Sequence, residues 1–125
     1  MTIARSLNHV SFAVRDLDRS LAFYCDLIGL QPLPRPDFGF PGAWLGVGDA
    51  QIHLIQVPAG VDVGSPPPTI NPAAGHTAFF VDDYSATLSK LHGAGLAVVE
   101  TSAEMGQMWV QDPDGHIIEF LCVRR

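Results

Sequence analysis

The sequence predicts an α+β domain built from two βαβββ modules of about fifty residues each. Two observations lead to this prediction. Residues near the start of the chain recur 67 positions later, and each copy alternates between strand and helix patterns. The 125 residues suit one domain that folds around its own core without a disulfide. We therefore expect a single domain over residues 1–125, with modules at about 6–58 and 75–124 and a proline-rich linker at 59–74.

The internal repeat includes polar as well as apolar residues. With an offset of 67, segment 8–21 falls on segment 75–88, and five positions are identical: His9/His76, Phe12/Phe79, Val14/Val81, Asp16/Asp83 and Leu21/Leu88. The module ends match at an offset of 66, where 52–55 falls on 118–121. A one-residue difference between the two offsets indicates a short deletion within a duplicated module.

The first module predicts one strand, one helix and three further strands. Alternating residues indicate a strand over 7–14, and Asp16 or Asp18 can cap a helix that ends at Gly29. The helix has apolar residues at helical spacing, Leu17, Leu21, Tyr24 and Ile28. The remaining strands are expected at about 30–33, 43–47 and 51–57.

The second module repeats this order. A strand is expected over 76–81 and a helix over about 83–92, ending at the glycines that follow. Three strands follow near 97–100, 107–111 and 116–123, and the turn before the last of them lies at Asp112–Gly115.

Composition and charge exclude several classes of protein. Hydrophobic residues make up 47% of the chain and charged residues 16%, which is typical of a globular protein rather than a disordered one. The formal net charge of −6 argues against nucleic acid or an anionic membrane as partner. The sequence shows no apolar signal segment, and Cys25 and Cys122 form no motif, so we expect a cytoplasmic protein with reduced thiols.

Four polar residues occupy positions where strands of this kind are normally apolar. Glu119 interrupts the apolar run 117–123 and His53 interrupts 52–55, at matching places in the repeat. His9 and His76 match each other at the start of each module. A buried, unpaired carboxylate is costly, whereas three imidazoles and a carboxylate form a common ligand set for a divalent transition metal.

A single histidine in a strand is more often a core or surface residue than a ligand. The coincidence of four such residues at equivalent positions favours a metal site formed by His9, His53, His76 and Glu119. Small residues (Ser11, Ala13 and Ala78) share the predicted strand faces of the first-strand histidines and leave room beside them. We assign His92 and His116 to structural or solvent-facing roles, because one lies near a helix end and the other on the opposite face of its strand.

The chain resembles the vicinal oxygen chelate superfamily, which includes glyoxalase I, extradiol dioxygenases and bleomycin-resistance proteins. The resemblance covers residues 6–124 and is carried by three segments: NHVSFAVRDL at 8–17, SLAFYCDLIGL at 20–30 and DPDGHIIEF at 112–120. The segment RPDFGFPGAWL at 35–45 is similar to glyoxalase-like proteins. The resemblance implies a cupped mixed sheet around the metal, with helices outside, formed within one chain or across a homodimer.

The resemblance also implies the chemistry. The four ligand positions carry over as His9, His53, His76 and Glu119, and the metal is expected to be zinc, nickel, cobalt or iron. The expected activity is that of a glyoxalase-like lyase or isomerase on a small-molecule substrate chelated through neighbouring oxygens. Bacterial glyoxalase I commonly has glutamate where this sequence has His53, so Glu119 is left as the one carboxylate that can move a proton.

Two alternative functions remain open, and so does the role of four further residues. An iron-dependent dioxygenase is the first alternative, although extradiol members generally use only two histidines and one glutamate. The second is a non-enzymatic binding protein of the resistance type, whose members generally lack the ligands. Four residues could line the substrate pocket or could simply be core residues: Phe38, Trp44, Met108 and Trp109.

Overall fold

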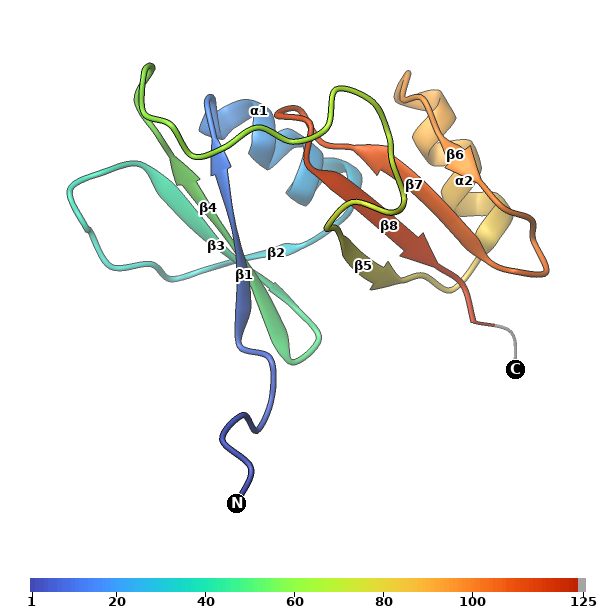
Figure 1. Cartoon of the computed structure of the whole chain (residues 1–125), viewed down its shortest axis with the longest axis horizontal. Coiled ribbons are helices and arrows are strands. Elements are labelled where there is room, and N and C mark those ends of the chain that lie inside the picture. Colours follow the sequence, from blue (N-terminus) through green and yellow to red (C-terminus); the bar gives the residue numbers. More distant parts are fainter. Residues whose placement is uncertain (124–125) are drawn as a thin grey trace. The chain divides into compact units, whose positions relative to one another are not determined.

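Two four-stranded mixed sheets form the framework of the chain in the computed structural model, which describes residues 1–123 (Figure 1). They belong to two compact units, Met1–Val63 and the residues from Gly64 onward. The predicted α+β class and the two βαβββ modules are therefore confirmed. The predicted end of the second module at Arg124 lies outside the described residues.

The first unit runs from β1 (His9–Val14) through a helical segment to β2 (Gln31–Leu33), β3 (Gly42–Val47) and β4 (Ala50–Gln56). Its sheet has the order β1-β4-β3-β2, in which β1 and β4 are parallel and the other pairs antiparallel. The first and last strands of the module are therefore neighbours, because the helical segment carries the chain from β1 to β2 at the far edge of the sheet and β3 and β4 then return toward β1.

The helical segment differs from the prediction in its second half. It begins as α1 (Leu17–Leu21), capped by Asp16, whose carboxylate accepts a hydrogen bond from the Arg19 amide at 3.2 Å. It continues as a π-helix, η1 (Ala22–Leu27), in which the Ile28 amide donates to the Phe23 carbonyl. The wider turns accompany the burial of two adjacent rings, Phe23 and Tyr24, and the segment ends before Gly29 as expected.

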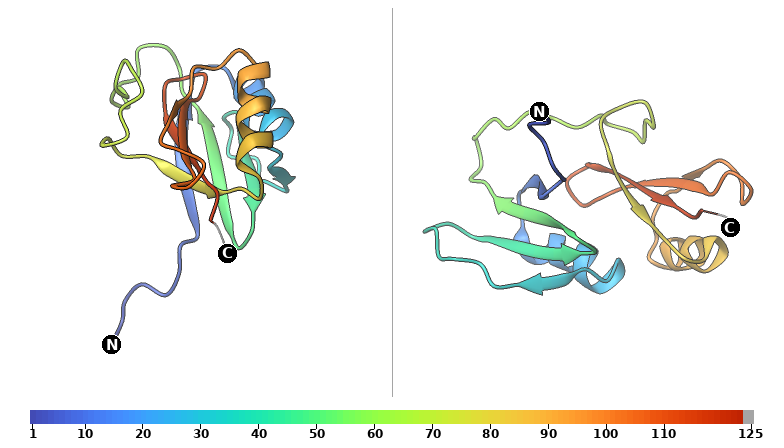
Figure 2. Two further views of the ribbon diagram at one scale, coloured as in Figure 1. Left: turned by 90° about the vertical axis from the view of Figure 1, so that its right-hand side faces the viewer. Right: turned by 90° about the horizontal axis from the view of Figure 1, so that it is seen from below.

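The second unit repeats the arrangement. It contains β5 (Thr77–Phe80), α2 (Tyr84–Gly93), β6 (Val99–Glu100), β7 (Gln107–Gln111) and β8 (Ile117–Leu121). The sheet order is β5-β8-β7-β6, and β5 is parallel to β8. Helix α2 begins after its cap Asp83 and lies along one face of this sheet (Figure 2).

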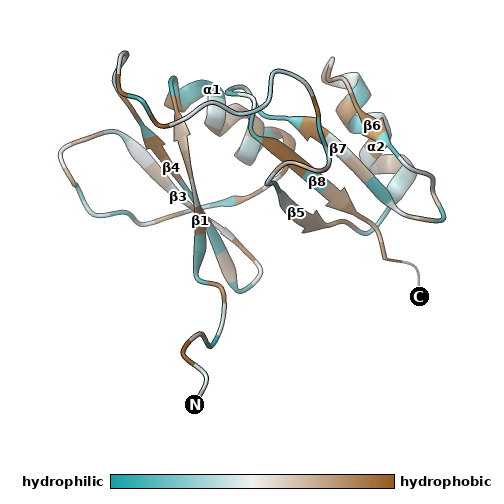
Figure 3. Cartoon of the chain, in the orientation of Figure 1, coloured by the Kyte–Doolittle hydropathy of each residue, from teal (hydrophilic) through white to brown (hydrophobic). Residues whose placement is uncertain are grey.

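Each sheet has one core face and one face that carries polar residues. In the first unit the core face holds Phe12, Val14, Leu45, Ile52 and Leu54, against which Tyr24 packs with its ring 5.7 Å from that of Phe12. In the second, the core face holds Phe79, Met108, Val110, Ile118 and Phe120. The strong apolar colouring of β8 reflects this burial (Figure 3). In the part of the chain that the structure describes, no helix is both long and apolar enough to span a bilayer.

The registers of the two sheets agree with the repeat. Ser11 lies opposite His53 in the first sheet, and Ala78 lies opposite Glu119 in the second. The offsets between these pairs are the 67 and 66 residues found in the sequence. Small residues therefore adjoin both of the last-strand ligand candidates, as the sequence predicts.

Gly106 gives a test of how closely β7 approaches the segment after β8. Its φ is +77°, and a side-chain carbon there would overlap with the Cys122 carbonyl oxygen. We expect Gly106→Ala to lower the free energy of unfolding by about 3 kcal/mol. Gly95→Ala, also at positive φ but with no atom within 4 Å, should lower it by about 1 kcal/mol. Urea unfolding measures both, and equal losses would contradict the close approach.

Candidate functional site

The first pair of predicted ligands lies on the polar face of the first sheet. His9 on β1 is in register with Gln51, and His53 follows two residues later on β4, so both imidazoles project from the same face. Their rings stack with centroids 3.9 Å apart and an interplanar angle of 14°. Trp44, in register with His53 on β3, stacks on it at 4.7 Å. The three rings form a continuous stack.

Neighbouring amide side chains orient both histidines. His9 Nδ1 lies 2.7 Å from Asn8 Oδ1, and His53 Nε2 lies 2.8 Å from Gln51 Oε1. Because these oxygens accept hydrogen bonds, the nitrogens facing them carry protons, and the other nitrogen of each neutral ring keeps a lone pair. The stacked rings hold these lone pairs in nearly parallel planes. The pair has the right donor chemistry for a metal, but its lone pairs do not converge as the rings lie.

The surroundings of His53 favour its neutral form. Burial lowers the pKa of His53 from its ordinary value of 6.5, and the positive charges of His9 and Arg35 lower that pKa further. A metal ligand must be neutral imidazole, so these surroundings reduce the competition from protons.

The second pair, His76 and Glu119, is in direct contact in the second unit. His76 Nε2 lies 2.9 Å from Glu119 Oε1, and the carboxylate is 6% exposed. Trp109, in register with Glu119 on β7, donates its indole N–H to the same Oε1 at 3.0 Å. Gln107 donates to Oε2 at 3.4 Å. The carboxylate that the sequence marks as costly to bury is therefore fully partnered, with one oxygen held more closely than the other.

The hydrogen bond on the far side of His76 decides what can lie between the two side chains. His76 Nδ1 lies 2.7 Å from the Ala74 carbonyl oxygen, which only accepts, so Nδ1 carries a proton. In the neutral ring Nε2 then presents a lone pair to Glu119 Oε1. Two acceptors at 2.9 Å require a cation between or beside them, either a proton or a metal ion.

The second pair suits a transition metal in its donor chemistry. A backbone carbonyl that accepts from the remote ring nitrogen is the usual support of a ligating histidine. A tetrahedral ion bound at about 2.05 Å holds its ligand atoms about 3.3 Å apart, so the 2.9 Å between His76 Nε2 and Glu119 Oε1 is the separation of a hydrogen-bonded ion pair. His76 and Glu119 have the donor chemistry of two ligands, and a metal would require the two atoms to separate by a few tenths of an ångström.

The four candidates thus lie as two pairs, one in each unit. Among residues 1–123, no three histidine, cysteine, aspartate or glutamate side chains gather into a group that could hold a metal ion. Of the residues predicted to line the substrate pocket, Trp44 and Trp109 adjoin the pairs, and Phe38 contacts Trp44 with ring centroids 6.0 Å apart.

Met108 differs from the prediction. It is fully buried in the core of the second unit, in register with Phe120, on the face opposite Trp109. Adjacent residues of a strand point to opposite faces, so Met108 and Trp109 do not line the same space. We therefore assign Met108 to the core.

Sequence reasoning missed the groups that orient the ligand candidates. Asn8 precedes His9, Gln51 lies two residues before His53 on the same strand face, and Gln107 lies two residues before Trp109. The spacing of Gln51 and Gln107 could have indicated them, because residues two apart in a strand share a face. The Ala74 carbonyl gives no signal in the sequence.

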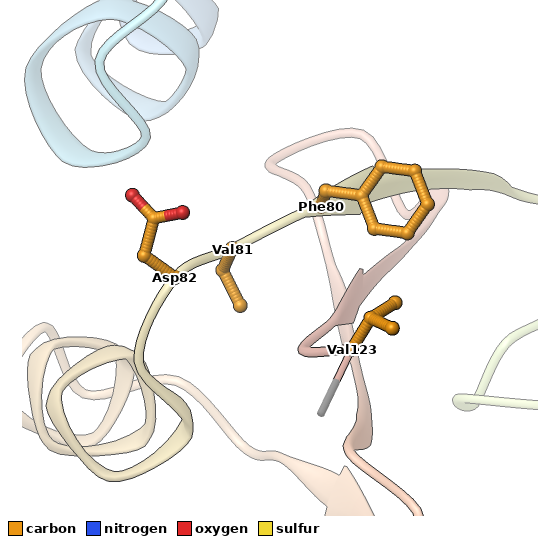
Figure 4. Close-up of a pocket in the computed structure, with 4 residues that line it drawn as sticks. All are labelled: Phe80, Val81, Asp82 and Val123. Carbon is orange, nitrogen blue, oxygen red and sulfur yellow. The ribbon is translucent and has the colours of Figure 1, made fainter. Parts of the chain in front are cut away.

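A separate pocket of about 500 Å³ lies at the end of β5 in the second unit. It is lined by Phe80, Val81, Asp82 and Val123, which Figure 4 draws as sticks. None of the predicted ligands or pocket residues is among them, so the pocket is not part of the candidate site.

Comparison with known proteins agrees with this fold. The family model "Glyoxalase/Bleomycin resistance protein/Dioxygenase superfamily" matches residues 6–120. The chain is 36% identical to "Glyoxylase I 4" of Arabidopsis thaliana, over 91% of this chain and 68% of that protein. It is 31% identical to the lactoylglutathione lyase of Haemophilus influenzae, over 90% and 89% of the two chains. The structure of a glyoxalase/dioxygenase from Nostoc punctiforme has a similar fold, with a TM-score of 0.77, 22% identity and coverage of 97% and 92%.

The lowered pKa of His53 predicts how stability depends on pH. In metal-free protein the unfolded chain binds a proton at His53 near pH 6.5, and the folded chain binds it only at lower pH. The free energy of unfolding should therefore fall as the pH falls below 6.5, and His53→Gln should reduce this fall. Urea unfolding on both sides of pH 6.5 measures the change, with His92→Gln as control. An unchanged pH dependence in His53→Gln would show that His53 is not the group responsible.

Proposed function

Because the chain belongs to the Glyoxalase/Bleomycin resistance protein/Dioxygenase superfamily, we propose that it is a metal-dependent lyase or isomerase of the glyoxalase type. The substrate is a small carbonyl compound or hemithioacetal with oxygens on neighbouring carbons. The observation that carries the proposal is the contact at 2.9 Å between His76 and the buried Glu119, two groups with the donor chemistry of metal ligands that hold a cation between them, whether a proton or a metal ion. The names of the Arabidopsis and Haemophilus relatives support the reaction class.

The proposed ligands are His9, His53, His76 and Glu119, contributed as one pair from each module. Zinc, nickel, cobalt and iron suit this set of three imidazoles and one carboxylate. When bound, such a metal stabilises negative charge on the substrate oxygens. We also expect the chain to form a homodimer. The two pairs could then meet either within one chain or across the two chains of the dimer.

Glu119 is the proposed proton shuttle. Its Oε1 is engaged by His76 and by the Trp109 indole, whereas Oε2 accepts one hydrogen bond at 3.4 Å from Gln107. Oε2 is therefore the oxygen with capacity to take a proton. It removes a proton from the carbon that bears the substrate hydroxyl, and the electron pair moves toward the neighbouring carbonyl. Oε2 returns that proton to the second carbon, while the hydroxyl proton passes to the former carbonyl oxygen, so that the carbonyl and the hydroxyl exchange carbons.

The other groups of the site hold the base and exclude water. The Trp109 N–H fixes the carboxylate plane, and the burial of the indole, which is 7% exposed, keeps solvent from the shuttle. Trp44 and Phe38 supply aromatic surface beside His53. We propose that the three aromatic residues contact the apolar part of the substrate.

Two alternatives have distinct signatures. Iron as the metal that purifies with the protein, together with oxygen consumption, would favour a dioxygenase. Failure to bind any ion from a panel of divalent metals would favour a non-enzymatic binding protein of the resistance type. Elemental analysis of protein purified without added metal is the first measurement, and we expect about one transition metal per chain.

Ligand variants test whether both pairs are needed. We expect His76→Ala and His53→Ala each to lower metal content from about one ion to less than about a tenth per chain after dialysis, because each removes one of few strong ligands. His92→Ala, at the end of α2, is the control and should retain the metal. Loss in His76→Ala alone would contradict the four-ligand set and leave the second pair as the site. Retention by both variants would overturn the site.

Replacement of the base tests the reaction. Glu119→Gln keeps the side-chain shape but cannot accept the proton, so kcat/KM of metal-loaded protein for the methylglyoxal–glutathione hemithioacetal should fall by about 100-fold or more. Glu104→Gln, a matched change on an exposed residue, should leave it unchanged. Turnover by Glu119→Gln at the rate of the unmodified protein would remove Glu119 from the mechanism, and no turnover by the metal-loaded natural chain would exclude this substrate.

A further inference from the structure

The loop between β2 and β3 holds one arginine against two phenylalanine rings, which stack on each other with centroids 6.0 Å apart. The Arg35 guanidinium carbon lies 4.9 Å from the ring centre of Phe38 and 5.0 Å from that of Phe40. One of its nitrogens, Nη1, donates to the Phe40 carbonyl at 3.2 Å. Asp37 shapes the loop by accepting a hydrogen bond from the Gly39 amide at 2.8 Å. The arginine is therefore held in place by its own loop.

The position of Gly42 shows that Arg35 also lies close against the sheet. A side-chain carbon at Gly42 would approach Arg35 Nη2 to 2.8 Å and the Leu54 carbonyl oxygen to 2.6 Å. Glycine at the start of β3 leaves this space to the guanidinium.

No carboxylate of the described residues neutralises the charge of Arg35. Within residues 1–123 its guanidinium has no carboxylate at ion-pairing distance, although the chain has thirteen acidic residues. Arg35 is half-buried, and a partly desolvated guanidinium is stabilised by an anion. Its planar array of N–H groups matches the two oxygens of a carboxylate.

Arg35 is joined to the candidate ligands by a line of aromatic rings. Phe38 contacts Trp44 at 6.0 Å, and Trp44 stacks on His53 at 4.7 Å. Phe38 and Phe40 are 51% and 45% exposed, so an apolar group can cover them.

We propose that Arg35, Phe38 and Phe40 form a binding site for a carboxylate attached to a planar apolar group, and that this site selects an anionic substrate. Its position beside His53 rests on the proposed function, since the reacting end of the substrate would lie at the ligands. The carboxylate contact does not need the metal. Arg35 is thus a specificity residue that touches the substrate away from the reacting carbons.

Binding to metal-free protein tests this site apart from the reaction. The probes are trans-cinnamate and its neutral match trans-cinnamamide, followed by ligand-detected NMR at low salt. We expect the natural chain to bind cinnamate at least tenfold more tightly than cinnamamide. Arg35→Met should remove this preference and leave cinnamamide binding unchanged, whereas Lys90→Met, an equal change of charge on α2, should preserve the preference.

Any other result would contradict the proposed carboxylate-binding site. Equal binding of the two probes by the natural chain, no binding of either, or a preserved preference in Arg35→Met would show that Arg35 only holds its loop. If Arg35→Met unfolds, Arg35→Lys replaces it. That variant keeps the charge but loses the planar fork, and it should reduce the preference at least threefold. Because the protein is metal-free, a failure here leaves the proposed lyase untouched, and a failure of the lyase assay leaves this site untouched.

Discussion

The parallel pairing of the first and last strands of each module is the constraint on which the candidate site depends. Parallel neighbours cannot be joined by a tight turn. In each module the helical segment instead carries the chain from the first strand to the far edge of the sheet, and the three following strands return antiparallel until the last lies beside the first. The pairing brings side chains more than forty residues apart onto one face, which is how His9 meets His53 and how His76 meets Glu119. A shift of one residue in register would move one member of each pair to the core face. The small residues Ser11 and Ala78 beside the last-strand candidates keep that face open.

The burial of Glu119 imposes the second constraint. A carboxylate with 6% exposure needs hydrogen-bond partners, and Glu119 has three. They are the side-chain amide of Gln107 and the indole of Trp109, both on β7, and the imidazole of His76. The Ala74 carbonyl fixes the proton on the remote nitrogen of His76, so the contact between the pair is completed only by a cation. The backbone before β5 therefore determines the chemistry of a carboxylate on β8. The same reasoning explains why the first pair differs, because His9 and His53 are both oriented by amide oxygens and stack instead of sharing a charge.

The sequence predicts most of the fold because the duplicated pattern supplies each element twice. The strands lie within a few residues of their expected bounds, and Asp16 and Asp83 cap the helices as capping chemistry requires. The π-helical turns at 22–27 were not predictable from apolar spacing, which fits an α-helix equally well. Strand parity in the sequence already places Met108 and Trp109 on opposite faces, and the structure has Met108 in the core, which is one of the two roles that the sequence left open for it. The orienting groups Gln51 and Gln107 were missed although each lies two residues from His53 or Trp109 on the same strand face, whereas Asn8, adjacent to His9, gives no such signal.

The difference between the two modules at the equivalent positions 53 and 119 also affects the charge of the proposed site, and with it the class of ligand that the site favours. Equivalent positions hold His53 in one module and Glu119 in the other, so the proposed ligand set carries one negative charge where a pair of glutamates would carry two. A metal with fewer anionic ligands keeps more positive charge and is the stronger Lewis acid. Arg35 adds a further positive charge near His53 that no carboxylate of residues 1–123 neutralises. In a chain with a net charge of −6, these two features make the region around His53 locally favourable to an anion. In the proposed site, one carboxylate in place of two would therefore limit the number of proton shuttles and, at the same time, favour acidic substrates.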